Sequence, residues 1–301
     1  MFNSAAIEVA HSLRILACSL IFISPFASLA VEMNGHEIMA ESQLRHQQFP
    51  YVYEEQSMIL IDAAGNRRVR RSRLFTRLES NGSVKFLLIF DQPAEIRGVA
   101  LLATRDNDGK IQRGVYLPAF GQEVKHPRGS GLEGQFLGTD FTIADLTPES
   151  LEDNRYVRLD DRQIDNHLFF VIEAHPRATP SRHGGNSGLR RHLIRQDNFM
   201  IVRTDIYDAA LRFYKRVSYH DLKRVDGDSW RANTIIAHDS REAHRTVLKV
   251  NRRVYSQDYV PKELFEESYL LANRHINHAA LGAPLSKVSD AERQLLSRSG
   301  E

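Results

Sequence analysis

The chain has 301 residues, of which 42% are hydrophobic and 26% charged, and its formal net charge is +2. These values are ordinary for a soluble globular protein and exclude a strongly basic chain, so no nucleic acid is expected as a partner. The only cysteine is Cys18, which excludes a disulfide framework and a cysteine-based metal site.

The N-terminal segment predicts export from the cytoplasm. Residues 15–30 are nearly all apolar or small, and Ser28 and Ala30 suit the small-residue positions of a signal-peptidase site. The run is shorter than the roughly 20 apolar residues of a membrane-spanning helix, and Pro25 interrupts it. We therefore expect a signal peptide over residues 1–30, cleaved near Ala30, rather than a retained membrane anchor. The mature chain would then be a periplasmic protein.

The first half of the mature chain predicts a helix followed by strands. Asn34 and Glu37 have the spacing of a capping box, so a helix is expected to about residue 47. Turn signals such as Asn81-Gly82 separate the apolar runs that follow. Residues 85–90 are apolar without alternation, which indicates a strand that is covered on both faces. The expected strands are 58–62, 69–78, 85–90, 99–103 and 114–117.

The second half continues this pattern. Thr147-Pro148 is typical of a helix start, since proline at the first helical position loses no hydrogen bond. Residues 175–195 are rich in Gly, Pro, Ser and Arg and predict a long basic loop of unassigned role. A capping box at Ser289 and Glu292 predicts a short tail helix. The expected strands are 168–174, 199–205, 211–219, 231–238 and 244–255.

This order of elements predicts a mainly β fold with minor α content. No linker or repeat divides residues 31–301, so a single domain is expected. A meander of this length must close, curl or take a helix as cover, because its edge strands otherwise present unpaired backbone groups. A curled sheet around a helix leaves a concave apolar face, which is a natural cavity for a hydrophobic ligand.

Three blocks in the middle of the chain resemble a known family. Residues 91–102 read DQPAEIRGVALL, residues 116–119 read YLPA, and residues 134–146 read GQFLGTDFTIADL. In this order and spacing they resemble the LolA-like outer membrane lipoprotein-sorting proteins. The opening helix at residues 35–39 and the late strand at residues 244–250 extend the resemblance over the mature chain.

The resemblance implies a half-open antiparallel β-barrel curled around helices, with a cavity for acyl chains. It implies a periplasmic carrier or binder of lipid or lipoprotein cargo that works with a membrane exporter of the resistance-nodulation-division (RND) class. Neither a cofactor nor a covalent step is implied. An envelope hydrolase acting on lipid or glycan, and an adaptor that clamps an exporter without binding a ligand, are the alternatives. Ile143 and Ala144 replace a tyrosine and an acidic residue of the family pattern, so details of cargo and partner need not carry over.

Six aromatic and aliphatic residues are candidates for the cavity lining. Alternation along a strand places side chains on one face, but the same side chains could equally fill a closed core. Burial of an acyl chain would gain about 0.8 kcal/mol per methylene, so a modest slot would suffice for binding. The six residues are Phe86, Leu88, Phe90, Tyr116, Phe136 and Phe141.

Asp140 and Asp145 are the acidic residues of the third block. Two carboxylates can act as acid and base where their environments separate their pKa values. Turn and cap chemistry also explains both residues, and the sequence has neither a nucleophile elbow nor an H-E-x-x-H zinc motif. No catalytic, cofactor-binding or metal-binding residues are therefore expected. The histidines weighed for a metal site are His175, His183, His192, His275 and His278.

One predicted strand is strongly basic at its start, where Arg67, Arg68, Arg70 and Arg71 lie close together. Clustered arginines gain about 1 kcal/mol each near an anionic membrane, so this segment is a candidate for peripheral contact with lipid head groups or with an acidic partner. The alternative is a solvated strand face, because charges commonly protect exposed strands from pairing.

Overall fold

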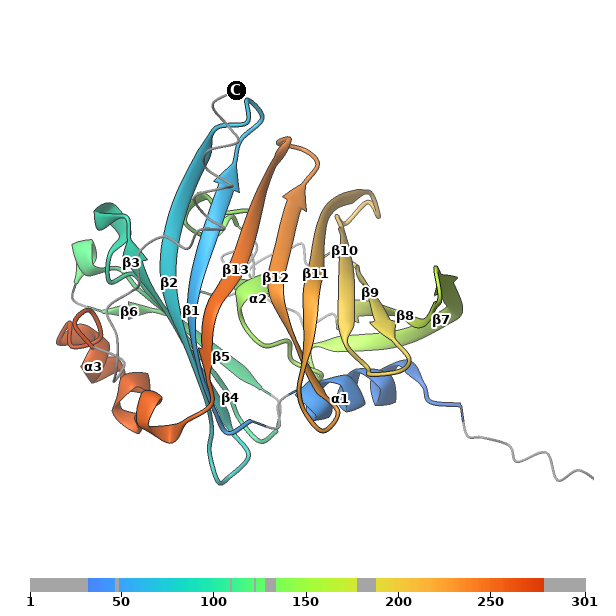
Figure 1. Cartoon of the computed structure of the whole chain (residues 1–301), viewed down its shortest axis with the longest axis horizontal. Coiled ribbons are helices and arrows are strands. Elements are labelled where there is room, and N and C mark those ends of the chain that lie inside the picture. Colours follow the sequence, from blue (N-terminus) through green and yellow to red (C-terminus); the bar gives the residue numbers. More distant parts are fainter. Residues whose placement is uncertain are drawn as a thin grey trace, which may run out of the picture. The chain divides into compact units, whose positions relative to one another are not determined.

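The computed structural model describes residues 32–46, 49–108, 110–121, 123–127, 134–177 and 188–278, so the expected signal peptide and tail helix lie outside it. From Met33 onward these residues form one compact unit. Their strands make a single 13-stranded antiparallel sheet, which confirms the predicted mainly β fold (Figure 1). Within these residues, no helix has the length and the apolar character needed to cross a membrane.

The sheet follows chain order except at one junction. The first strand pairs with the last, so the sheet runs β6-β5-β4-β3-β2-β1-β13-β12-β11-β10-β9-β8-β7 and stays open between its edges β6 and β7. The strands are β1 (Tyr51–Ile61), β2 (Arg67–Leu78), β3 (Val84–Gln92), β4 (Ala100–Arg105), β5 (Ile111–Tyr116), β6 (Val124–Lys125), β7 (Asn154–Ile164), β8 (His167–Pro176), β9 (Arg190–Arg195), β10 (Ile201–Tyr207), β11 (Phe213–Asp226), β12 (Ser229–Asp239) and β13 (His244–Val254).

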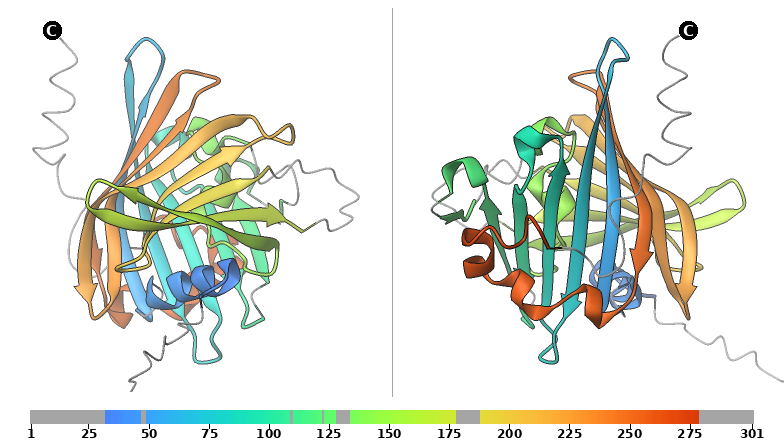
Figure 2. Two further views of the ribbon diagram at one scale, coloured as in Figure 1. Left: turned by 90° about the vertical axis from the view of Figure 1, so that its right-hand side faces the viewer. Right: turned by 60° about the vertical axis from the view of Figure 1, so that its left-hand side comes forward.

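The connection between the two edges of the sheet lies on its concave face. Because β6 and β7 are at opposite edges, the chain between them must cross the sheet. Residues 134–148, which we call the plug, contain η4 (Phe136–Gly138) and α2 (Ile143–Leu146) and pack against the concave side (Figure 2). The curled sheet with an internal helical segment is therefore present, as the resemblance implies.

Helices also cover one end and the convex side of the sheet. The opening helix α1 (Gly35–His46) begins with the predicted capping box, in which the Glu37 N–H donates to Asn34 Oδ1 at 3.0 Å. A Cβ atom on Gly35 would lie 3.0 Å from the backbone nitrogen of Arg158 in β7, so a larger residue there would require the backbone of β7 to shift. The convex cluster includes residues of η6 (Lys262–Phe265) and α3 (Glu267–Leu271), and Tyr259 of η5 (Gln257–Tyr259) packs against it. Two further short helices, η1 (Ala94–Ile96) and η2 (Pro118–Phe120), follow β3 and β5.

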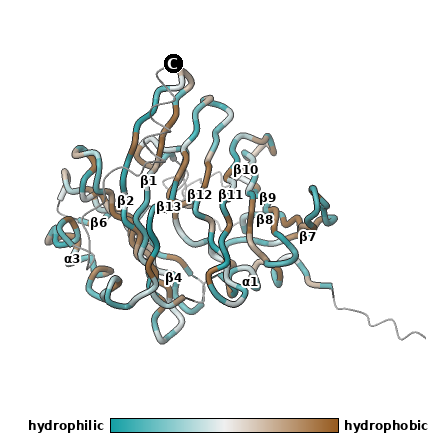
Figure 3. The backbone as a smooth tube through the Cα atoms, viewed as in Figure 1, coloured by the Kyte–Doolittle hydropathy of each residue, from teal (hydrophilic) through white to brown (hydrophobic). Residues whose placement is uncertain are grey.

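Strand β3 has buried side chains on both of its faces, as the unbroken apolar run predicts. Phe86, Leu88 and Phe90 belong to the concave core cluster, which includes the plug. Leu87 and Ile89 belong to the convex cluster, which η6 and α3 cover. The resulting apolar centre is visible along β1 to β4, where hydrophobic segments lie side by side (Figure 3).

Several local predictions differ from the structure, among them the length of β1, which begins at Tyr51 rather than at residue 58. The helix expected at Thr147-Pro148 is wrong, because α2 ends at Leu146 after the capping box of Thr142 and Asp145. The loop expected over residues 175–195 is wrong at both ends: β8 continues to Pro176 and β9 begins at Arg190. Strand β7 was not predicted, since its outer half is charged and exposed at a sheet edge.

Candidate functional site

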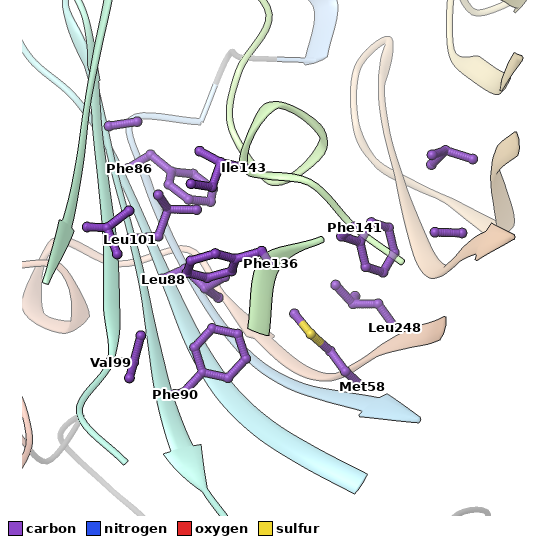
Figure 4. Packing of buried hydrophobic residues seen from close by; sticks show 14 of the residues in the cluster. Met58, Phe86, Leu88, Phe90, Val99, Leu101, Phe136, Phe141, Ile143 and Leu248 are labelled. Atoms are coloured by element: carbon purple, nitrogen blue, oxygen red, sulfur yellow. The ribbon is translucent and has the colours of Figure 1, made fainter. Parts of the chain in front are cut away.

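A cavity of about 300 Å³ lies between the concave face of the sheet and the plug. It runs along the strands, from partly exposed Phe49 and Leu78 near the end of α1 to buried Leu88 and Phe141. Figure 4 shows Leu88 and Phe141 among the buried hydrophobic residues of the concave core cluster. Most of its lining is apolar: Val52, Leu74, Leu78, Val84, Phe86, Leu88, Phe141, Leu146, Pro148, Met200, Ala232, Ile235, Leu248 and Val250.

Five of the six candidate lining residues belong to the concave core cluster. Phe86, Leu88 and Phe141 line the cavity itself. Phe90 and Phe136 pack against each other beside it, with ring centroids 6.0 Å apart.

Tyr116 lies on the opposite face of the sheet. Alternation along β5 directs Val115 into the concave cluster and Tyr116 into the convex one. The Tyr116 hydroxyl donates to Asn273 Oδ1 at 2.8 Å, and its ring meets His275 edge-on. Tyr116 therefore attaches the chain after α3 to the sheet and does not face the cavity.

Asp140 anchors the plug to β13. The Thr246 hydroxyl donates to Asp140 Oδ2 at 2.7 Å, and the same hydroxyl oxygen accepts the Asp140 N–H at 3.0 Å. The other carboxylate oxygen of Asp140 contacts His244 Nδ1. Both oxygens are thus engaged in holding the plug.

Asp145 anchors the plug at a second place. It caps α2, accepting the Thr142 N–H at 2.8 Å, and it forms a buried ion pair with Lys215 of β11. Arg190 of β9 lies 3.6 Å from its other oxygen. Burial alone would raise the pKa of Asp145, but the Lys215 and Arg190 charges outweigh burial and hold it below its usual range.

A second cavity of about 180 Å³ lies behind the plug and shares Asp145 and Tyr219 with the first. Its lining mixes apolar residues with several charged and polar side chains. Glu149 accepts a hydrogen bond from the Tyr156 hydroxyl at 2.9 Å and lies 3.6 Å from His192 Nε2. Burial opposes ionisation of Glu149, but His192 and Arg190 lower its pKa to about 2. Glu149 and Arg190 therefore bring opposite charges together inside the fold.

The end of the larger cavity near α1 carries its own charged groups. Arg253 Nε donates to Glu54 Oε1 at 2.6 Å, and the Gln56 amide donates to the other Glu54 oxygen at 2.6 Å. Arg231 and His46 complete this end. Burial, followed by the charge of Arg231, lowers the pKa of His46 to about 4, so His46 is neutral at pH 7.

The described residues hold no group of three or more His, Asp or Glu side chains that could bind a metal ion. His175 contacts Glu173, His192 contacts Thr204, and His275 contacts the Gly98 carbonyl. His278 lies against Phe75, and His183 falls outside the described residues.

The four arginines at the start of β2, which we call the hairpin-tip arginines, point to two faces. Figure 1 shows the β1–β2 hairpin extending past the neighbouring strands. Alternation places Arg68 and Arg70 on the concave side and Arg67 and Arg71 on the convex side. Arg68 is exposed, whereas the other three are half-buried. Burial and then the neighbouring Arg68 lower the pKa of Arg70.

Solved structures with the same fold were found at low sequence identity. A domain from Vibrio parahaemolyticus named as an outer membrane lipoprotein-sorting protein is 24% identical, with a TM-score of 0.69 over 79% of this chain and 98% of that one. A DUF1329 family protein from Desulfovibrio piger is 20% identical, with a TM-score of 0.68 over 78% and 97%. A LolA superfamily protein from Nitrosomonas europaea is 16% identical, with a TM-score of 0.61 over 79% and 100%.

The sequence of this chain matches the model of one protein family. A comparison with curated proteins found no match. A family model described as "uncharacterized protein"-like matches residues 82–272, which is more than half of the chain. The chain therefore belongs to this family, and its fold is that of the LolA-like outer membrane lipoprotein-sorting proteins.

Proposed function

We propose that this protein carries or binds molecules with acyl chains, either lipids or lipoproteins, in the periplasm. The observation that carries the proposal is the apolar cavity of about 300 Å³ between the sheet and the plug. A folded core is normally packed with few voids larger than a water molecule, so a cavity of this size is a binding site by default.

The cavity is large enough to hold a chain of useful length. A water molecule takes about 30 Å³ of liquid, so about 300 Å³ accommodates roughly ten groups of similar size. Ten buried methylenes would gain about 8 kcal/mol, which corresponds to a dissociation constant of about 1 μM before the costs of association. The costs of association weaken the binding below this figure, which suits a carrier that must also release its cargo.

The fold and the chemistry of the side chains support a carrier rather than an enzyme. The Vibrio parahaemolyticus domain with the same fold is named for lipoprotein sorting. The polar groups at the plug are engaged in anchoring it, and the cavity lining presents mostly aliphatic and aromatic carbon. Such a lining binds by exclusion of water and needs no covalent step.

Two further parts of the proposal concern the surroundings of the protein. The hairpin-tip arginines would contact anionic head groups, because they gather at one projecting end of the sheet. An inner-membrane exporter of the RND class would deliver or receive the cargo, a prediction that rests on the resemblance in sequence. Residues 1–30 would be removed on export.

Native mass spectrometry of residues 31–301, purified gently from an envelope fraction, tests the proposal. We expect a co-purifying mass that organic solvent removes and that identifies a lipid. After its removal, a neutral dye such as Nile red should bind, and dodecanol should displace it. Replacement of Val250 by Trp should fill the cavity and reduce both the co-purification of lipid and the binding of Nile red. A delipidated protein that binds neither dye nor alcohol would refute the carrier function.

A further inference from the structure

The charged side chains that line the larger cavity leave one positive charge without a negative partner, and this charge indicates which kind of ligand would bind. Four formally charged side chains line the cavity: Glu54, Asp145, Arg231 and Arg253. Glu54 and Arg253 neutralise each other, with nitrogen and oxygen 2.6 Å apart. Asp145 is neutralised by Lys215, which lies behind the lining. His46 is neutral at pH 7. Arg231 is therefore the unbalanced charge.

Arg231 has no carboxylate within ion-pair distance among the residues that the structure describes. Its surroundings are aromatic, with the Phe49 ring centroid 6.0 Å from its guanidinium carbon and Tyr255 nearby. Glu54 is within electrostatic reach but is bonded to Arg253 and Gln56. An arginine side chain that is partly removed from water without a partner is costly, so it is normally paired with an anion.

The strand register places Arg231 where a head group would sit. Arg231 is the third residue of β12, and the N–H of its neighbour Trp230 donates to His46 Nδ1 at the end of α1. Leu78 and Phe49, at the same end of the cavity, are partly exposed, whereas Leu88 and Phe141 further in are buried. A chain inserted from this end would point its tail at Phe141 and leave its head beside Arg231.

We infer that the ligand of this cavity is a single-chain amphiphile with an anionic head group, bound with its head at Arg231 and its tail against the plug. The inference rests on the proposed carrier function and names its ligand class. A carboxylate and a phosphate share the required chemistry, since either can accept two hydrogen bonds from one guanidinium group. A charge-assisted pair of this kind should favour the anion over a neutral head group by roughly 10- to 100-fold.

Displacement of Nile red from delipidated residues 31–301 by ligands with the same tail tests this inference. The probes are dodecanol, dodecanoate and monododecyl phosphate. We expect either anion to displace the dye at a concentration roughly 10-fold or more lower than the concentration of dodecanol that is needed. A preference for dodecanoate indicates a free fatty acid, and a preference for dodecyl phosphate indicates a lipid with a phosphate head group.

Variants of Arg231 separate charge from packing. Arg231→Gln should lose the preference for anions and keep the affinity for dodecanol, while Arg231→Lys should restore part of the preference. Arg224→Gln is the matched control, since Arg224 pairs in register with Trp230 but its side chain is exposed. Equal affinities of the wild type for dodecanol and both anions would overturn the inference and leave the carrier function standing. Failure of all three probes would overturn the carrier function itself.

Discussion

The buried pair of Lys215 and Asp145 gives the sharpest test of how the plug is held. Each side chain is only 3% exposed, and the pair joins β11 to the first turn of α2. Removing one partner of a buried pair costs about 3–5 kcal/mol where the other charge is left alone. After Lys215→Met, Arg190 would remain 3.6 Å from Asp145, so we expect a loss of about 2–4 kcal/mol in the free energy of unfolding.

A double-mutant cycle distinguishes this charge effect from packing. Asp145→Asn keeps an oxygen for the Thr142 N–H but removes the negative charge, and it should cost about 2–4 kcal/mol alone. The double variant removes both charges and leaves neither alone. Its loss in the free energy of unfolding should therefore be about 2 kcal/mol smaller than the sum of the two single losses. Urea unfolding followed by circular dichroism and by the fluorescence of the single tryptophan gives each value.

Lys223→Met is the control for the loss of a lysine in the same strand. Its side chain is 64% exposed and pairs with exposed Asp221, so its removal should leave the urea midpoint close to that of the wild type. The reasoning is refuted if Lys215→Met is no more destabilising than this control, or if the single losses at Lys215 and Asp145 simply add.

Three further predictions concern the cavity, the anchor at β13 and the hairpin tip. Phe141→Ala should lower the free energy of unfolding by about 3–5 kcal/mol in urea and should shift the preferred alcohol in Nile red displacement toward longer chains; an unchanged preference would contradict the placement of the tail. His244 has a raised pKa, because the hydrogen bonds that its ring donates to the Glu242 and Asp140 carboxylates outweigh partial burial. Its contribution to stability is therefore complete below its usual pKa of 6.5 and is lost as the pH rises through the pKa of the folded state. The difference in melting temperature between wild type and His244→Gln should therefore be larger at pH 5 than at pH 9, and the opposite trend would exclude a charged His244. Replacing all four hairpin-tip arginines by serine should weaken sedimentation with anionic vesicles at low salt, and unchanged binding would remove the docking proposal.

The sequence predicted those elements whose signals are local. The capping box of Asn34 and Glu37 begins α1 because both oxygens bond to backbone groups within one turn. The unbroken apolar run in β3 indicated two covered faces without any knowledge of the elements that cover them. The antiparallel meander followed from turns at short intervals, since hairpins pair neighbouring strands.

The parts that could not be predicted depend on distant partners. Strand β7 is polar along its outer half, because an edge strand with one exposed face needs few apolar residues. The face of Tyr116 depended on the register of β5, and a shift of one residue would have reversed it.

The charged residues of the site show the same limit. Lys215 and Arg190 are single residues in ordinary strand sequence, and only the folded chain brings them to Asp145. Arg231 follows the single tryptophan without any motif around it. The one available signal for such a site residue was a charged residue at a strand position where alternation predicts an apolar one. The same signal occurs at many solvent-exposed positions that have no such role.

The pairing of β1 with β13 has a consequence for how the protein is made. Tyr53 lies opposite Val254, so the middle of the sheet joins the earliest and the latest strands to be synthesised. Contacts between such distant segments slow folding, because a long loop must close before they stabilise anything. Until β13 emerges, β1 has an unpaired edge that invites aggregation. Nascent chains that end before residue 244 should therefore depend on chaperones that prevent this edge from aggregating.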